Sequence, residues 1–314
     1  MLNALAIVLE QPEHLALSRL DVTPPGEQDV VVRTSWSGVS TGTERLLFTG
    51  RMPPFPGMGY PLVPGYETVG TIVYAGSETA YREGQTVFVP GSRCFGPVRG
   101  LFGGAASQLV TPAARIIEVS AHLGERAILL ALAATALHAR ADKPKRGREL
   151  IVGHGVLGRL LARLSVLDGG EPPVVWERNE ARRAGAEGYE VTSPELDTIK
   201  DYVTVFDVSG DSSILDTLIA RLAPGGEIVL AGFYDKPLSF AFPPAFMREA
   251  NIRVAAEWRH PDLMAVREKI ESGALSLDGL ITHCEPATNA AVAYPTAFDD
   301  PACLKMVLDW RTCQ

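Results

Sequence analysis

Cysteine is scarce in this sequence, with four in 314 residues, and no two of them form a Cys-x-x-Cys pair. This usage excludes the disulfide frameworks of small secreted proteins and favours a reducing compartment, so we expect a cytoplasmic protein. Positive charge is also in short supply, because 29 Lys and Arg stand against 37 Asp and Glu, for a formal net charge of −8. An acidic chain without a basic run is a poor partner for a polyanion, which excludes nucleic acid.

Long apolar runs are absent as well. A membrane-spanning helix needs about 18 consecutive apolar residues, and no such segment occurs, so we expect no membrane span. The apolar N-terminus has no basic region before it and leads directly into Glu10, which argues against a signal peptide. The composition, with 46% hydrophobic and 21% charged residues, is that of an ordinary globular protein, and the length allows two domains.

Short β-type runs fill the first part of the chain. Residues 4–9 and 15–20 are separated by a turn and predict a hairpin. Residues 50–65 contain five prolines and four glycines and predict a long loop, whose aromatic residues favour a binding role. We therefore predict a mostly β domain over residues 1–125.

Strand and helix signals alternate from residue 126 to residue 258, and repeated β-α-β units of this kind predict a doubly wound parallel sheet. The expected strands are 150–152, 174–176, 203–208, 228–231 and 252–255. The expected helices are 157–167, 180–185 and 213–222. Residues 259–314 are expected to complete the first domain and to contain two more helices, at 261–272 and 301–310.

Three glycines in the pattern Gly-x-Gly-x-x-Gly follow the first of these strands and precede an apolar-periodic helix. Gly153 allows the tight turn, Gly155 lets a pyrophosphate approach the backbone, and Gly158 lets helix and strand pack closely. The amides of Val156 and Leu157 begin the helix, whose positive end attracts phosphate. The pattern predicts a Rossmann dinucleotide site. The alternative is a glycine-rich turn in another α/β protein.

An acidic residue stands at the end of the next strand. Glu177 would accept hydrogen bonds from the adenosine ribose hydroxyls and repel a 2′-phosphate, so NAD is favoured over NADP. Arg178 follows directly and could contact a phosphate, which weakens this preference.

Ordered landmarks over nearly the whole chain resemble the medium-chain dehydrogenase/reductase superfamily. They include residues 38–44, 64–70, 84–89, 103–110, 135–139, 206–210, 224–226 and 280–283. The resemblance implies an α/β protein with a GroES-like β-rich catalytic domain and a Rossmann domain, paired as a homodimer. It also implies cofactor contacts from Thr135, Ser209 and Gly210.

Zinc members of this superfamily hold a catalytic metal through cysteine, histidine and a further cysteine or glutamate. By resemblance, the corresponding positions here are Thr41, Tyr66 and Ala131. A hydroxyl, a phenol and a methyl group do not replace those ligands. The structural zinc lobe needs four cysteines, and only Cys94 occurs in residues 90–104. We therefore expect neither metal.

Within the superfamily, residues 37–67 resemble the dehydrogenases of bacteriochlorophyll a biosynthesis. That resemblance implies oxidation by NAD of a 1-hydroxyethyl group on a tetrapyrrole macrocycle to acetyl. Conjugation with the macrocycle would stabilise positive charge on the carbon that loses the hydride, which reduces the need for a metal. Two alternatives stay open: a zinc-free NADPH-dependent quinone or enoyl reductase, and a dinucleotide-binding protein without catalytic activity.

The first domain also offers candidates for the chemistry. Tyr66 could bond the substrate hydroxyl. Thr41 and Thr43 could relay a proton, and Glu67 stands beside the position of the family's metal. Their structural alternatives are a buried phenol bonded to a carbonyl, capping threonines and a supporting carboxylate. A flat apolar macrocycle with a propionate suits the aromatic, thioether and cationic residues Phe55, Met58, Tyr60, Phe95, Arg45 and Arg51, which could equally be core rings and solvated arginines.

Overall fold

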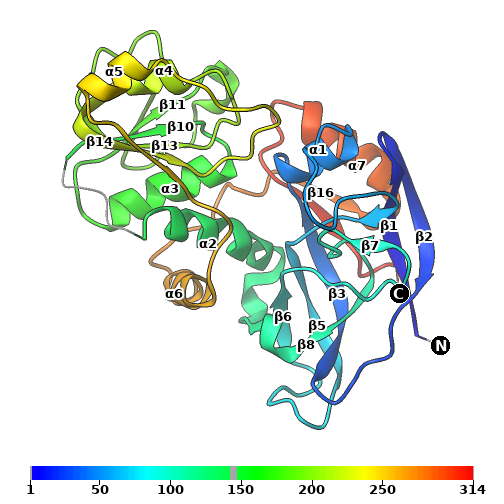
Figure 1. Ribbon diagram of the computed structural model, residues 1–314. Coiled ribbons are helices and arrows are strands. Elements are labelled where there is room, and N and C mark those ends of the chain that lie inside the picture. The colour runs from blue at the N-terminus through cyan, green and yellow to red at the C-terminus, as the bar shows by residue number, and fades with distance from the viewer. Residues whose placement is uncertain (1, 142–146, 314) are drawn as a thin grey trace. The chain divides into compact units, whose positions relative to one another are not determined.

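The computed structural model describes residues 2–141 and 147–313 and divides into two compact units (Figure 1). Unit 1 consists of residues 1–131 and 280–314, and unit 2 consists of residues 132–279. The first change of unit falls inside helix α2 (Leu130–Ala139). The chain returns to unit 1 at Leu280 and not at residue 259, so helix α6 (His260–Glu271), which matches the helix expected at 261–272, belongs to unit 2.

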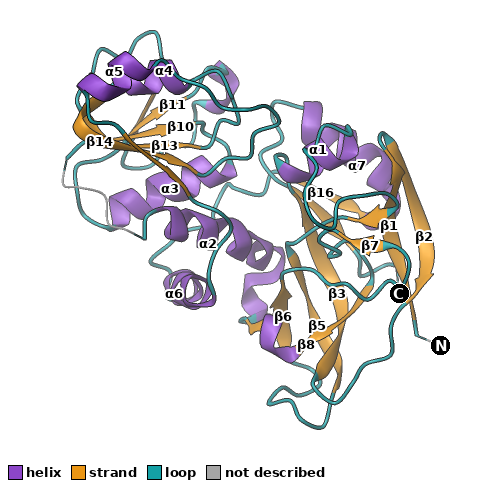
Figure 2. Ribbon diagram, in the orientation of Figure 1, coloured by secondary structure: helices purple, strands orange, loops and turns teal. Residues whose placement is uncertain are grey.

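Unit 1 is built mainly from β-strands (Figure 2). They are β1 (Asn3–Gln11), β2 (His14–Asp21), β3 (Asp29–Val39), β4 (Leu62–Val63), β5 (Thr68–Ala75), β6 (Thr86–Val89), β7 (Arg99–Gly100), β8 (Gln108–Pro112), β9 (Ile117–Glu118), β16 (His283–Pro286) and β17 (Met306–Asp309). One sheet has the order β2-β1-β4-β7, and β1 and β2 form the predicted hairpin. The other has the order β16-β17-β3-β5-β6-β9, with β8 paired to β3.

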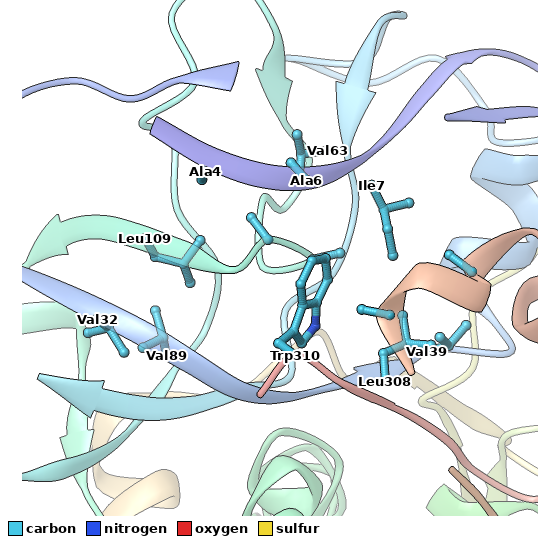
Figure 3. Close-up of a cluster of buried hydrophobic side chains, with 14 of the residues drawn as sticks. Ala4, Ala6, Ile7, Val32, Val39, Val63, Val89, Leu109, Leu308 and Trp310 are labelled. Carbon is cyan, nitrogen blue, oxygen red and sulfur yellow. The ribbon is translucent and has the colours of Figure 1, made fainter. Parts of the chain in front are cut away.

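Few helices accompany these strands in unit 1. They are α1 (Thr43–Phe48), α7 (Ala290–Asp299) and the 3-10 segments Ala113–Arg115, Ala121–Leu129 and Ala287–Asn289. The main core closes around Trp310, which directly follows β17 and is 0% exposed among Ile7, Val39 and Leu308 (Figure 3). The Trp310 indole N–H donates to Ser37 Oγ at 2.8 Å, so its polar atom is satisfied inside the core. The C-terminal segment therefore completes the core of the N-terminal sheets.

The helix expected at residues 301–310 is wrong. Residues 306–309 form strand β17, which pairs with β3 on one side and with β16 on the other. An apolar run as short as Met306-Val307-Leu308 suits a buried strand as well as a helix, and pairing with β3 decides between them. The helix of this region is α7, which the sequence does not predict because Pro295 lies inside it.

Unit 2 contains the predicted parallel sheet, with six strands in the order β12-β11-β10-β13-β14-β15. They are β10 (Glu149–Val152), β11 (Val174–Trp176), β12 (Glu190–Thr192), β13 (Tyr202–Asp207), β14 (Leu222–Leu230) and β15 (Asn251–Val254). The helices, besides α6 and most of α2, are α3 (Val156–Leu167), α4 (Leu215–Ile219) and α5 (Phe242–Met247). The helix expected at 180–185 is only a 3-10 turn at Glu180–Arg182. Across the described ranges, no helix has the length and hydropathy needed to cross a bilayer.

Candidate functional site

The loop between β3 and α1 is pressed against the segment that precedes β5. A side chain at Gly38 would place its Cβ 2.1 Å from Glu67 Oε2, so only glycine lets the two segments approach this closely. This contact brings residues 40–44 beside Tyr66. Two of the sequence-predicted stretches, near 41 and near 66, therefore meet in one unit.

Tyr66 is the centre of a small hydroxyl cluster. Its Oη lies 2.8 Å from Ser40 Oγ and also forms a hydrogen bond with the Thr43 side chain. The ring is partly exposed and meets the Phe102 ring edge-on, with 5.5 Å between centroids. Burial of the phenol, reinforced by the negative charge of Glu67, raises the pKa of Tyr66 well above its usual value. Tyr66 is therefore a neutral donor and acceptor, not a base. Thr41 lies on the exposed side of the same loop.

Glu67 is buried and is neutralised by a lysine from the other end of the chain. Lys305 Nζ donates to Oε2 and Oε1 of Glu67 at 2.7 and 3.0 Å and to the Val39 carbonyl at 3.3 Å. With exposures of 0% and 2%, Glu67 and Lys305 do not reach a substrate. The sequence reasoning missed Lys305, because a single lysine before an apolar strand carries no signal of its partner.

Glu44 is a second buried carboxylate beside the cluster. Its Oε1 accepts the Ser40 backbone N–H at 2.9 Å, and its Oε2 accepts the Tyr294 hydroxyl at 2.8 Å. Burial, with a smaller contribution from the charge of Glu67, raises the pKa of Glu44 to about 7, although its two hydrogen bonds and Lys305 oppose the shift. The sequence places Glu44 in the right loop but does not reveal Tyr294.

The proline- and glycine-rich loop of residues 50–65 packs on a small apolar cluster. Phe55, Met58 and Tyr60 are half-buried against residues that include Leu46 and Leu101. The Tyr60 hydroxyl donates to a backbone carbonyl of α1. These three side chains are partly exposed, and their contact with a substrate stays a prediction.

Phe95 and the arginines Arg45 and Arg51 have different surroundings from that loop. Phe95 is 1% exposed and belongs to the main core of unit 1, so a substrate contact from its ring is not supported. Arg45 is exposed and lies 3.6 Å from Asp299, and Arg51 is exposed and donates to the Thr49 hydroxyl at 3.1 Å.

The three residues that by resemblance correspond to catalytic zinc ligands have side chains that do not fit a zinc ion. Thr41 contributes a hydroxyl, Tyr66 a protonated phenol and Ala131 a buried methyl group. Zinc in proteins is bound by thiolate, imidazole and carboxylate. Within residues 2–141 and 147–313, no three His, Cys, Asp or Glu side chains gather as a metal would require.

In unit 2 the three glycines of the predicted dinucleotide motif lie at the turn from β10 to α3. Gly153 has φ +109°, which favours glycine, and it makes the turn from β10 to α3. A Cβ at Gly155 would meet no protein atom within 4 Å, so the backbone is open to a ligand there. A Cβ at Gly158 would lie 1.9 Å from the Gly153 carbonyl oxygen. The amides of Val156 and Leu157 begin α3, whose first turn has no side-chain cap and suits a pyrophosphate.

Glu177 is held in place beside these glycines. Its Oε1 accepts the Asn179 N–H at 2.8 Å, and its Oε2 accepts the His154 N–H at 3.2 Å. The oxygens keep free lone pairs with which to accept ribose hydroxyls. Arg178 is exposed and lies 3.7 Å from Asp211, so its charge is partly balanced.

The other predicted cofactor residues lie on neighbouring elements of unit 2. The Ser209 N–H and hydroxyl both donate to Asp207 Oδ1, at 2.9 and 2.7 Å, which orders the turn after β13. Gly210 follows with φ +72°. Thr135 lies partly exposed on α2.

Sequence reasoning missed the buried support behind the glycine turn. His154 Nδ1 lies 2.7 Å from the Arg182 carbonyl, and Nε2 lies 2.9 Å from the Tyr189 hydroxyl. Arg159 donates to the carbonyls of Arg182 and Ala184 at 3.0 and 2.8 Å. Burial lowers the pKa of His154 to about 4, so it stays neutral. These contacts hold the loop that follows Glu177 in place.

Comparison with known proteins adds four findings. The alcohol dehydrogenase GroES-like domain family matches residues 26–121. The 2-desacetyl-2-hydroxyethyl bacteriochlorophyllide A dehydrogenase of Cereibacter sphaeroides is 57% identical over 311 residues, which cover 98% of this chain and 98% of that protein. A short chain alcohol dehydrogenase of Escherichia coli complexed with NADH superposes with a TM-score of 0.83 at 20% identity, covering 98% and 99% of the two chains. A zinc-binding dehydrogenase of Sinorhizobium meliloti bound to NADP gives 0.81 at 19% identity, with 98% and 100% covered.

Proposed function

This chain belongs to the family of the 2-desacetyl-2-hydroxyethyl bacteriochlorophyllide A dehydrogenases, in the medium-chain dehydrogenase/reductase superfamily, and we propose that it oxidises the hydroxyethyl group of a bacteriochlorophyllide to acetyl. The reaction removes a hydride from carbon and a proton from oxygen. A bound nicotinamide cofactor supplies the hydride acceptor. With dehydrogenases as relatives, the chain is an alcohol dehydrogenase, and neither a quinone or enoyl reductase nor a protein without activity is favoured.

The observation that carries the proposal is the hydroxyl cluster of Tyr66, Ser40 and Thr43, in which Tyr66 by resemblance takes the position of a zinc ligand. In this proposal the Tyr66 phenol holds the substrate hydroxyl by a hydrogen bond. Ser40 and Thr43 both donate and accept, so they can pass the hydroxyl proton onward as the hydride leaves. Thr41, on the exposed side of the loop, would lead that proton to solvent.

We further propose that the oxidation proceeds without zinc. The residue types at Thr41, Tyr66 and Ala131 support this, because none of them is a ligand that zinc accepts in proteins. The substrate itself reduces the need for a Lewis acid. Positive charge on the carbon next to the macrocycle spreads into the conjugated ring as the hydride departs.

For the cofactor we propose NAD in preference to NADP. Glu177 supports this choice, because its carboxylate accepts hydrogen bonds from a 2′-hydroxyl and repels a 2′-phosphate. The Arg178 guanidinium would contact the 2′-phosphate of NADP only after breaking its ion pair with Asp211.

The tetrapyrrole itself would bind on unit 1. We propose that Phe55, Met58 and Tyr60 provide an apolar surface for the ring, and that Arg45 or Arg51 meets its propionate. Phe95 does not belong to this apolar surface, because it is buried in the core.

A homodimer remains the proposed assembly. Among the described strands, β15 is one of the two edges of the parallel sheet. Val254 on it is exposed, as are Phe246 and Met247 on α5. Apolar side chains beside an unpaired strand edge favour pairing with a second copy. We also place the protein in the cytoplasm, because NAD is its proposed substrate and none of the four cysteines, all within the described residues, forms a disulfide.

One experiment tests the proposed function. The purified protein is incubated without oxygen with 3-hydroxyethyl bacteriochlorophyllide a and either NAD or NADP, while the long-wavelength band of the macrocycle and the metal content are followed. We expect conversion with NAD, slower conversion with NADP and no stoichiometric zinc. An unchanged macrocycle spectrum would refute the activity, and one zinc per chain would refute the metal-free reaction.

A further inference from the structure

A line of hydrogen bonds leads from the core of unit 1 to the Tyr66 phenol. The Tyr294 hydroxyl on α7 donates to Glu44 Oε2, and Glu44 Oε1 accepts the backbone N–H of Ser40. The Ser40 hydroxyl then meets Tyr66 Oη. Tyr294, Glu44 and Ser40 are buried, and only Tyr66 is partly exposed.

We propose that Glu44 is a positioning residue for the alcohol oxidation: its carboxylate fixes the main chain at Ser40 and thereby directs the Ser40 hydroxyl onto Tyr66. The inference rests on the proposed function, because Tyr66 is taken there to hold the substrate hydroxyl. Glu44 itself is buried and does not touch the substrate.

The hydrogen bonds that the Glu44 carboxylate accepts argue for a role of Glu44 beyond packing. A buried carboxylate is a costly acceptor for one amide and one hydroxyl, because its charge must leave water. Lys305 is the described cation that acts on Glu44, but its ammonium group is bound to both oxygens of Glu67. Among the described residues, no cation forms an ion pair with Glu44 alone, so its carboxylate stays available as a charge-assisted acceptor. Its Oε1 accepts the amide of the loop that carries the hydroxyls.

The charged and polar groups around Glu44 make its link to Ser40 measurable. Glu44, in the first turn of α1, is faced by Tyr294 from α7, by the Ser40 amide from the preceding loop, and by Glu67 and Lys305. Its carboxyl therefore changes charge near neutral pH, where the ionised form accepts the Ser40 amide more strongly. Turnover should rise with pH across that transition.

Two readouts test the proposal in the full-length protein. The first is the amide proton shift of Ser40 by NMR from about pH 5 to about pH 9, which needs no substrate. The second is kcat for the hydroxyethyl substrate over the same range. In the wild type, both should follow a single inflection.

Two variants separate positioning from packing. Glu44→Gln keeps the size of the side chain and should remove the inflection from both readouts, with kcat lowered ~10-fold, equivalent to one weakened hydrogen bond, and KM for NAD unchanged. Tyr294→Phe removes a donor that favours ionised Glu44, so it should move both inflections to higher pH.

Different results would overturn the positioning role of Glu44 and the proposed function. A kcat inflection that persists at the same pH in both variants, or a Ser40 amide that does not titrate in the wild type, would overturn the proposal. If Glu44→Gln does not fold, the direction of the shift in Tyr294→Phe decides. A wild-type protein that leaves the macrocycle unchanged refutes the proposed function instead, and the Ser40 titration still decides whether Glu44 controls that loop.

Discussion

Lys305 Nζ lies 2.7 Å from Oε2 of Glu67, in an ion pair that is buried although 238 positions separate the two residues. The ammonium also donates to the Val39 carbonyl, so it has three oxygen acceptors. The pair joins the residue before β17 to the segment before β5. It therefore closes unit 1 directly beneath the hydroxyl cluster.

Removing one partner of this pair should destabilise the protein strongly. Lys305→Met leaves Glu67 buried and uncompensated, and we expect a loss of about 3–5 kcal/mol in the free energy of unfolding. Urea titration followed by circular dichroism measures it. As a control, Arg311→Met breaks the exposed pair with Asp309 and should cost no more than about 1 kcal/mol.

A double variant separates charge from packing at the same position. Glu67→Leu combined with Lys305→Met should recover much of the lost stability, because no buried charge is left unpaired. A single Lys305→Met variant as stable as the wild type would contradict the buried ion pair.

Glu44 should make stability depend on pH. Burial raises its pKa from 4.5 to about 7, so the folded protein holds this proton more tightly than the unfolded chain does. Its contribution is therefore complete below pH 4.5 and is lost as the pH rises to about 7, by roughly 3 kcal/mol. The unfolding free energies of Glu44→Gln and of the wild type are measured in urea at several pH values. As the pH rises across this window, the value of the variant should increase relative to that of the wild type. A constant difference would show that the carboxyl titrates normally.

Tyr66→Phe should slow the oxidation without unfolding the protein. The variant keeps the ring against Phe102 but loses the hydroxyl that bonds Ser40 and Thr43. We expect kcat to fall ~10- to 100-fold, equivalent to ~1–3 kcal/mol for an unmade hydrogen bond. Single-turnover kinetics measure the effect, and Tyr74→Phe on the exposed side of β5 serves as control. Near wild-type turnover in Tyr66→Phe would exclude the phenol from the reaction.

Glu177→Ala should change the choice of cofactor. Without the carboxylate, the ribose hydroxyls lose their acceptor and a 2′-phosphate is no longer repelled. We expect KM for NAD to rise ~10-fold while kcat/KM for NADP increases. Parallel titrations with both cofactors measure the ratio. If the ratio stays at its wild-type value, cofactor preference comes from other residues.

Features that are local in the chain could be predicted well. The glycine turn at 153–158 needs only the strand before it and the helix after it, and its acidic partner follows at the end of the next strand. The unsuitability of Thr41, Tyr66 and Ala131 for zinc is a matter of residue type alone. Burial of Phe95, in contrast, could not be distinguished from a place in a binding loop, because both suit an aromatic residue among glycines.

The sequence by itself determined the parallel dinucleotide unit, the glycine turn with Glu177 and the hydroxyl-bearing residues at 40–43. Periodicity, turn chemistry and residue type depend only on neighbouring positions in the chain. Only the tertiary structure decided that residues 306–309 form a strand, since a short apolar run takes its conformation from the partner β3. It also decided that Lys305 neutralises Glu67 and that Tyr294 bonds Glu44. These pairs join residues more than 230 positions apart, and their charges depend on burial, which no local pattern records.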